Sequence, residues 1–209
     1  MSIPVVADAD TLFAATTRGM LIYLDYEGPI KRGPIKLHWS PLILDEVGRA
    51  LVETGRKKTL EDARAHEARM RDALPNALVS VKDVQAQFQA VAPAVRSAKD
   101  AHVAACAHYL IAAKAYPGTP AVALVSRNTR DFRKAALAGL GIVLQKPDAF
   151  LDGLTVAQPD EVAAAFRRFR LDLASRPEPE ALLARLERDG QAKTAQRLRG
   201  LHQARTIAL

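Results

Sequence analysis

Two continuous apolar runs constrain the fold of this chain more than any other feature. Val5-Val6-Ala7 begins close to the N-terminus, and a second run occupies residues 120–126; neither alternates polar with apolar side chains. Strands of this kind are buried on both faces, as the strands of parallel sheets are. We therefore expect a parallel sheet in which the first run is a central strand.

Helical stretches separate these runs from three further strand candidates, at residues 36–40, 77–81 and 142–144. Apolar spacing and capping residues mark the helices between them. Strands and helices in alternation predict an α/β fold. For residues 1–151 we expect a three-layer α/β/α sandwich with a parallel sheet.

Residues 152–209 carry no strand signal. Val162, Phe166, Phe169 and Leu173 recur at spacings of four, three and four, which place them on one face of a helix. We expect this segment to be an α-helical C-terminal extension of the domain formed by residues 1–151. It has to pack on that domain, on a partner or on a second copy of the chain.

The composition is that of an ordinary globular chain with a basic excess. Hydrophobic residues make up 49% of the chain and charged residues 25%, with a formal net charge of +7. A basic excess suits an anionic partner such as nucleic acid, although composition alone favours simple solubility as its explanation. Charge therefore permits a nucleic-acid partner without demanding one.

The single cysteine, Cys106, lies in an apolar helical run and has no second cysteine to pair with inside the chain. This usage is typical of the reducing cytoplasm. Asp8 and Asp10 interrupt any apolar signal region, and no apolar run approaches the length of a membrane span. We expect a cytoplasmic protein without a membrane partner.

Five acidic residues stand at strand ends or in early helical turns. Asp8 and Asp10 follow the first strand, Glu46 lies one turn into a helix, Asp100 opens an alanine-rich helix, and Asp131 follows the strand at 120–126. The carboxyl ends of parallel strands meet at one edge of a sheet, where ligands and catalytic groups gather. Taken alone, Glu46 is explained by the helix dipole and Asp100 by capping. Only the occurrence of all five acids at such positions along the chain favours a functional site.

Carboxylates brought together in this way repel one another unless a hard cation lies among them, and oxygen ligands favour Mg²⁺ or Mn²⁺. A site of this kind activates water and stabilises the charge that develops on a phosphodiester. No P-loop, glycine-rich dinucleotide motif or serine or cysteine catalytic set competes with it. His102 and His108 are too far out of phase to bind one metal from one helical face, and we expect them to be structural or surface residues rather than ligands.

Four segments carry a resemblance to a known family. They are Val5-Val6-Ala7-Asp8-Ala9-Asp10-Thr11-Leu12, Ser40-Pro41-Leu42-Ile43-Leu44-Asp45-Glu46-Val47, Asp100-Ala101-His102-Val103-Ala104-Ala105-Cys106 and Val125-Ser126-Arg127-Asn128-Thr129-Arg130-Asp131-Phe132. In this order they resemble the PIN-domain family, and within it the VapC-type toxin ribonucleases. The resemblance covers residues 5–151 and implies Mg²⁺- or Mn²⁺-dependent cleavage of RNA, inhibition by a cognate VapB-type antitoxin, and homodimerisation.

By the same resemblance, Asp8, Glu46 and Asp100 match three acidic positions of the family. The fourth falls on Asn128 or Asp131, and we favour Asp131 as the charge. The expected catalytic set is thus Asp8, Glu46, Asp100 and Asp131, with Asp8, Asp100 and Asp131 as metal ligands. Supporting roles fall to Asp10, which departs from the family pattern, and to Ser126 and Asn128. Arg127 and Arg130 are the candidate RNA contacts.

Two alternatives remain open. Asp8 and Asp10 after the first strand resemble the start of a haloacid-dehalogenase-type phosphatase, but Thr11 stands one position too early for that motif and no later paired-aspartate motif follows. A catalytically weak module that binds RNA or protein would also use the basic excess and the helical extension. An assay for metal-dependent RNA cleavage distinguishes the nuclease from both alternatives.

Overall fold

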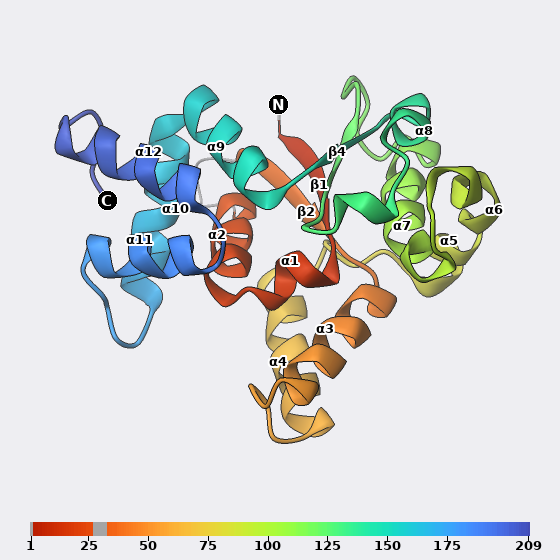
Figure 1. Cartoon of the computed structure of the whole chain (residues 1–209), viewed down its shortest axis with the longest axis horizontal. Coiled ribbons are helices and arrows are strands. Elements are labelled where there is room, and N and C mark those ends of the chain that lie inside the picture. The colour runs from red at the N-terminus through yellow and green to blue at the C-terminus, as the bar shows by residue number, and fades with distance from the viewer. Residues whose placement is uncertain (1, 27–32) are drawn as a thin grey trace.

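The computed structural model describes residues 2–26 and 33–209. Its centre is a four-stranded sheet in the order β2-β1-β3-β4, with every neighbouring pair parallel (Figure 1). The strands are β1 (Ile3–Ala7), β2 (Ile35–His38), β3 (Val122–Val125) and β4 (Ile142–Gln145). The two apolar runs of the sequence are the inner strands β1 and β3, which confirms the parallel sheet expected from them.

The strand order creates a switch point between β1 and β3. The chain leaves β1 towards β2 on one side of it, and leaves β3 towards β4 on the other. The two inner strands are in register at Ala7 and Val125, and the Asp8 amide donates a 2.9 Å hydrogen bond to the Val125 carbonyl. In open parallel sheets, the crevice for ligands lies at the carboxyl ends of the strands at this point.

The strand candidate at residues 77–81 is reduced to one parallel bridge, between Trp39 and Leu78. The Trp39 amide donates to the Ala77 carbonyl at 3.0 Å, and the Val79 amide to the Trp39 carbonyl at 2.8 Å. Ser80 then caps the next helix and ends the extended segment. The segment lies beside Trp39, the residue directly after β2, without becoming a regular strand.

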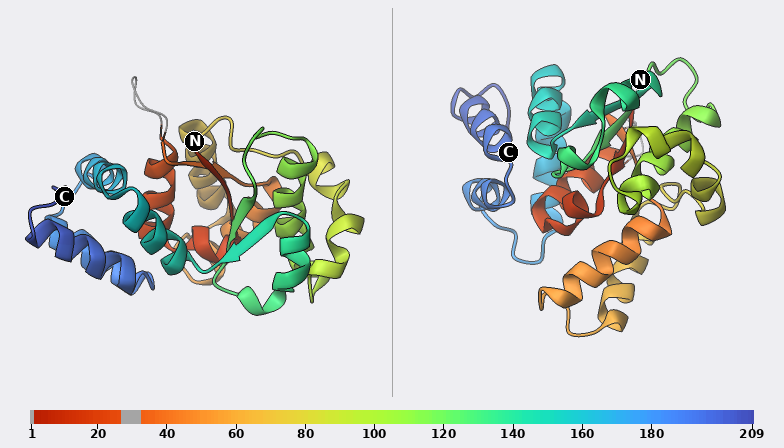
Figure 2. Two further views of the ribbon diagram at one scale, coloured as in Figure 1. Left: turned by 90° about the horizontal axis from the view of Figure 1, so that it is seen from above. Right: turned by 45° about the vertical axis from the view of Figure 1, so that its right-hand side comes forward.

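Helices cover both faces of the sheet. On one face lies α7 (Ala101–Ala112), whose buried residues include four small side chains in succession, at positions 104–107. Small side chains let a helix backbone approach the strands closely. On the other face lie α2 (Ala15–Asp25) and α9 (Pro147–Ala157), as the two views of Figure 2 show. The layers are therefore those of an α/β/α arrangement.

In the described part of the chain up to residue 146, the remaining elements are short helices and one helical hairpin. The hairpin, α3 (Pro41–Glu53) and α4 (Leu60–Ala73), projects from the carboxyl edge of the sheet (Figure 1). Ser40 caps α3, and Thr59 with Asp62 forms a capping box on α4. The others are α1 (Ala9–Phe13), α5 (Val81–Gln85), α6 (Phe88–Val91), α8 (Lys134–Gly139) and the 3₁₀ turns Ala92–Ala94, Ala98–Asp100 and Thr129–Asp131.

The C-terminal segment is helical, as expected: after α9 come α10 (Pro159–Asp172), α11 (Pro179–Arg188) and α12 (Ala192–Gln203). These helices lie on the α2 side of the molecule (Figure 1). Phe169 of α10 packs on Gly19 of α2 so closely that a Cβ at position 19 would lie 2.2 Å from the ring. The boundary expected at residue 151 falls inside α9, and buried residues on both sides of it belong to one hydrophobic core.

Among the described residues, none of the helices combines the length and the apolar character needed to cross a membrane.

Candidate functional site

Asp8 lies at the switch point of the sheet. It follows β1 directly and caps α1, where its Oδ1 accepts a 2.6 Å hydrogen bond from the Ala9 amide. The Ser126 hydroxyl, at the end of β3, donates a 2.7 Å hydrogen bond to Oδ2 of Asp8. The Asp8 residue is only 7% exposed. A carboxyl group is thus held between the two inner strands, at the place where α/β proteins bind ligands.

The environment of Asp8 disfavours its ionised form. Its pKa is raised from 3.8 to about 7: burial is the largest cause, the nearby Asp10 carboxylate and, less strongly, Glu46 add to it, and the hydrogen bonds from Ser126 and Ala9 only partly oppose the rise. A buried carboxylate with acidic neighbours is stabilised by a cation placed beside it.

Asp10 is held by the loop that follows β3. Its carboxylate accepts hydrogen bonds from the Arg127 amide at 3.1 and 3.0 Å and from the Asn128 amide at 2.9 Å. The Thr11 hydroxyl lies 3.0 Å from Oδ1 of Asp10 and 3.1 Å from the Val125 carbonyl. Asp10 therefore connects the start of α1 to the loop after β3.

Asn128 and Asp131, the two candidates for the fourth acidic position, touch each other. The Asn128 side-chain amide donates to Oδ2 of Asp131. Asp131 closes the 3₁₀ turn Thr129–Asp131, and its charge acts on Asp100. Both residues therefore belong to the same corner of the site, with Asp131 supplying the charge.

Asp100 lies close enough to Asp131 for the charge of Asp131 to act on it. It ends the turn Ala98–Asp100 and stands before α7, yet its side chain makes no capping hydrogen bond. Capping, the structural explanation for an acid at this position, is therefore not what this side chain does. Burial raises the pKa of Asp100, and the charges of Asp131, Glu46 and Asp10 raise it further.

Glu46 lies at the rim of the site. Its side chain is half exposed, and Oε2 is 3.5 Å from Nε2 of His102. Since Ser40 caps α3, Glu46 does not serve as the cap. It lines an open groove of about 650 Å³ between α3 and the start of α7. The groove is lined by Leu42, Asp45, Glu46, Arg49, Ala50, Glu53, Gln85, Phe88, Ala98, Lys99 and His102.

The five acids act on one another electrostatically: Asp8 responds to Asp10 and Glu46, and Asp100 responds to Asp131, Glu46 and Asp10. The sheet edge thus brings together the acids that the sequence placed at separate strand and helix ends. Within residues 2–26 and 33–209, no three acidic, histidine or cysteine side chains are arranged as a ready-made metal cage. Mg²⁺ commonly binds through one or two carboxylates and completes its shell with water and substrate phosphate. The oxygen-only donors at Asp8, Asp100 and Asp131 fit that chemistry.

The two candidate RNA contacts differ in their surroundings. Arg130 is exposed in the 3₁₀ turn after β3. Arg127 is also exposed, but its guanidinium donates to the backbone carbonyl of Asp189, in the turn between α11 and α12. One arginine faces solvent beside the acids, while the other connects the site loop to the C-terminal helices.

Sequence reasoning missed two neighbours of the site. His102 was expected to be only structural; its Nδ1 is 2.6 Å from the Lys99 carbonyl, but its other nitrogen faces Glu46. Its position two residues after Asp100 was the available signal. Asp189 gave no signal, because 62 residues separate it from Arg127.

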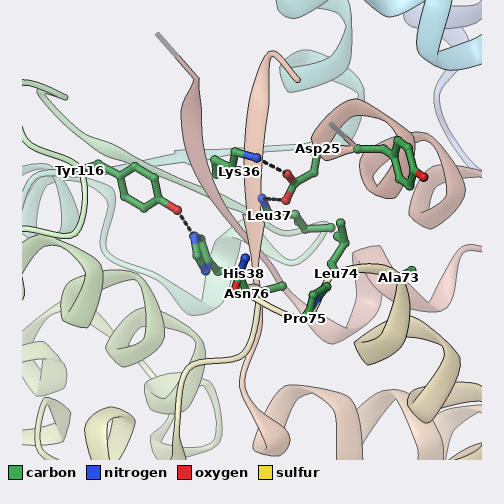
Figure 3. A pocket seen from close by; sticks show the side chains of 11 residues that line it. Asp25, Lys36, Leu37, His38, Ala73, Leu74, Pro75, Asn76 and Tyr116 are labelled. Atoms are coloured by element: carbon green, nitrogen blue, oxygen red, sulfur yellow. Dashed lines mark hydrogen bonds and ion pairs between the residues drawn. The ribbon is translucent and has the colours of Figure 1, made fainter. Parts of the chain in front are cut away.

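A second pocket, of about 280 Å³, lies along the edge strand β2 and contains none of the five acids. Figure 3 shows His38 and Tyr116 pointing towards each other in it, with the His38 Nε2 2.5 Å from the Tyr116 hydroxyl. Burial lowers the pKa of His38 to about 4, partly opposed by the Asp25 carboxylate and the Ala77 carbonyl. Asp25 accepts from Lys36 at 2.9 Å and from the Leu37 amide at 2.8 Å. His38 is therefore neutral near pH 7.

Comparison of the chain with protein-family models, curated proteins and solved structures found no match. The fold and site above define an α/β protein with an acidic cluster at the switch point of a parallel sheet.

Proposed function

We propose that this protein is a Mg²⁺- or Mn²⁺-dependent endoribonuclease of the PIN-domain, VapC type. The observation that carries the proposal is the setting of Asp8: a buried carboxyl group at the sheet switch point, with its pKa raised to about 7 by burial and by acidic neighbours. An ionised group in this position is stabilised most simply by a bound cation.

In this proposal, Asp8, Asp100 and Asp131 hold the ion. A bound Mg²⁺ or Mn²⁺ would supply an activated water and neutralise charge on the phosphodiester. Ser126 orients Asp8 through its 2.7 Å hydrogen bond, and Asn128 orients Asp131. Glu46, half exposed at the rim, accepts a proton or positions the attacking water.

RNA is the proposed substrate because the chain carries a formal net charge of +7 although its candidate site is acidic. Cations outside the site attract the phosphate backbone, and Arg130 is exposed beside the acids. We further propose that the protein is a cytoplasmic toxin, that it forms a homodimer, and that a VapB-type antitoxin inhibits it.

A second candidate, a module that binds RNA or protein without cleaving it, is favoured by one observation. Both oxygens of Asp10 already accept hydrogen bonds from the protein, as do both oxygens of Asp8. These four carboxylate oxygens therefore have hydrogen-bond partners even when no ion is bound. The phosphatase reading has no comparable observation in its favour, and a small phosphoester serves to test it.

The deciding experiment incubates the purified chain with total RNA in Mn²⁺, in Mg²⁺ and in EDTA, alongside two variants. Asp8→Asn keeps the size of the side chain and removes its charge, while Asp72→Asn, on the exposed face of α4, makes the same chemical change away from the site. We expect discrete fragments with metal only, lost by about 100-fold or more in Asp8→Asn and retained in Asp72→Asn.

Tight RNA binding without metal-dependent cleavage would instead support the binding module. Release of phosphate from a small phosphoester, without RNA cleavage, would support the phosphatase.

A further inference from the structure

The turn between α11 and α12 is anchored beside the acidic site. Oδ2 of Asp189 accepts hydrogen bonds from the amides of Thr16 at 2.6 Å and Thr17 at 3.1 Å. These amides open α2, whose own N-cap residue, Ala14, has no side chain able to cap. A residue of the C-terminal segment therefore caps a helix of the sheet domain, across more than 170 positions of sequence.

Gln191 makes the turn rigid from its other end. Its side chain is buried, with the residue 1% exposed, and its Nε2 donates to the Thr17 hydroxyl at 3.1 Å and to the Asp189 carbonyl at 3.2 Å. Gly190 between them adopts φ +83°, a conformation that glycine adopts without strain. The Asp189 carbonyl is thus held in place as a preorganised acceptor.

Arg127 connects this acceptor to the site. Its guanidinium donates to the Asp189 carbonyl, and a Cβ at Gly190 would lie 3.6 Å from its Nη1, so the guanidinium packs on the turn. The backbone amide of the same residue donates to both oxygens of Asp10, at 3.1 and 3.0 Å. One residue therefore contacts the C-terminal turn through its side chain and a site carboxylate through its backbone.

The loop that contains Arg127 reaches the other acids as well. Ser126 donates to Asp8 at 2.7 Å, the Asn128 amide donates to Asp10 at 2.9 Å, and the Asn128 side chain donates to Asp131. Three consecutive residues orient three of the five acids. A displacement of this loop would disturb the hydrogen bonds that orient all three carboxylates.

We propose that the α11–α12 turn is a positioning element of the acidic site, acting through Arg127. The turn holds the guanidinium, the guanidinium holds residues 126–128, and these residues hold Asp8, Asp10 and Asp131. Arg127 is then a positioning residue rather than an RNA contact, and the C-terminal helices are a working part of the site. The consequence for catalysis rests on the proposed nuclease function, whereas the hold on the loop does not.

The experiment measures amide hydrogen exchange of residues 126–131 in the full-length protein, in EDTA and without RNA. Arg127→Met removes the guanidinium but keeps the length of the side chain and the backbone amide; Arg127→Lys keeps a cation. The matched control is Arg197→Met, which breaks a different arginine contact of the C-terminal helices, away from the α11–α12 turn: the 2.5 Å ion pair of Arg197 in α12 with Asp152 of α9.

After correction for intrinsic rates, we expect exchange in this loop to be about tenfold faster in Arg127→Met, the factor for one lost hydrogen bond from a charged donor. The exchange rate of the loop in Arg127→Lys should lie between those of Arg127→Met and the wild type, and the rate in Arg197→Met should equal that of the wild type. Unchanged exchange in Arg127→Met would overturn the proposal. Equal acceleration in Arg127→Met and Arg197→Met would also overturn it, because that result means general loosening.

Kinetics then separate positioning from RNA binding. If the protein cleaves RNA, Arg127→Met should lower kcat by about tenfold and leave KM for RNA near the wild-type value. A raised KM with unchanged kcat and unchanged loop exchange would make Arg127 an RNA contact instead. If the wild type cleaves no RNA, the nuclease proposal fails, and the exchange measurement alone still decides whether the turn holds the loop.

Discussion

The Ser126 hydroxyl donates a 2.7 Å hydrogen bond to Oδ2 of Asp8 and so joins the carboxyl ends of β3 and β1 at the sheet switch point. Ser126 is fully buried, and its Oγ also accepts from the Asn128 amide at 3.1 Å. The bond stabilises the ionised form of Asp8, since a donated hydrogen bond lowers the pKa of the carboxyl group.

If Asp8 holds the ion of the proposed nuclease, Ser126→Ala should weaken Mn²⁺ binding and RNA cleavage by about 10- to 100-fold, the usual effect of removing a hydrogen bond to a metal ligand. The pH profile should shift upward, because Asp8 would ionise at higher pH. Calorimetric Mn²⁺ titration and cleavage rates between pH 6 and 9 check this. The control is Ser80→Ala, which removes the N-cap of α5 and costs stability but leaves the site intact.

The second prediction concerns the stability of Asp8→Asn. The folded-state pKa of Asp8, about 7, lies above its ordinary value of 3.8, so its contribution to stability is complete below pH 3.8 and is lost as pH rises through 7. In EDTA at pH 8 we expect Asp8→Asn to be more stable than the wild type by about 1–3 kcal/mol, with the gap closing towards pH 4. Urea midpoints measure it. A variant no more stable than the wild type at pH 8 contradicts the prediction.

His38 should make the protein acid-sensitive. Its folded pKa of about 4 lies below the ordinary value of 6.5, so the unfolded chain binds the proton first and stability falls as pH drops from 6.5 towards 4. The slope from this residue approaches about 1.4 kcal/mol per pH unit in that range. His38→Gln should flatten the slope of urea-unfolding free energy against pH. Equal slopes in His38→Gln and the wild type would refute this.

The contact between Gly19 and Phe169 predicts a coupled pair. In an ordinary helix, Gly→Ala gains about 1 kcal/mol. Here the added Cβ would lie 2.2 Å from the Phe169 ring, and overpacking costs about 1–3 kcal/mol. Gly19→Ala should therefore destabilise the protein, and Phe169→Leu should partly rescue it in the double variant. A double-mutant cycle by thermal unfolding gives the coupling; purely additive effects would mean that α10 does not pack on α2 in this way.

Local sequence patterns predicted the inner strands and most helices because both depend on short periodicities. The unbroken apolar runs at β1 and β3 indicated burial on both faces, and the structure confirms it. The same reasoning overestimated residues 77–81, which form one bridge because Ser80 already starts α5. After β1, the helical stretch is divided at Ala14 into α1 and α2.

The sequence by itself determined that acids follow strand ends and open helices, since Asp8, Asp10, Asp100 and Asp131 are placed by the same residues that form those elements. Only the tertiary structure decided that these acids share one edge, through the order β2-β1-β3-β4. It alone decided that the Arg127 amide holds Asp10 across 117 positions and that Asp189 caps α2 across more than 170. Such contacts depend on how whole layers pack, which no local periodicity encodes.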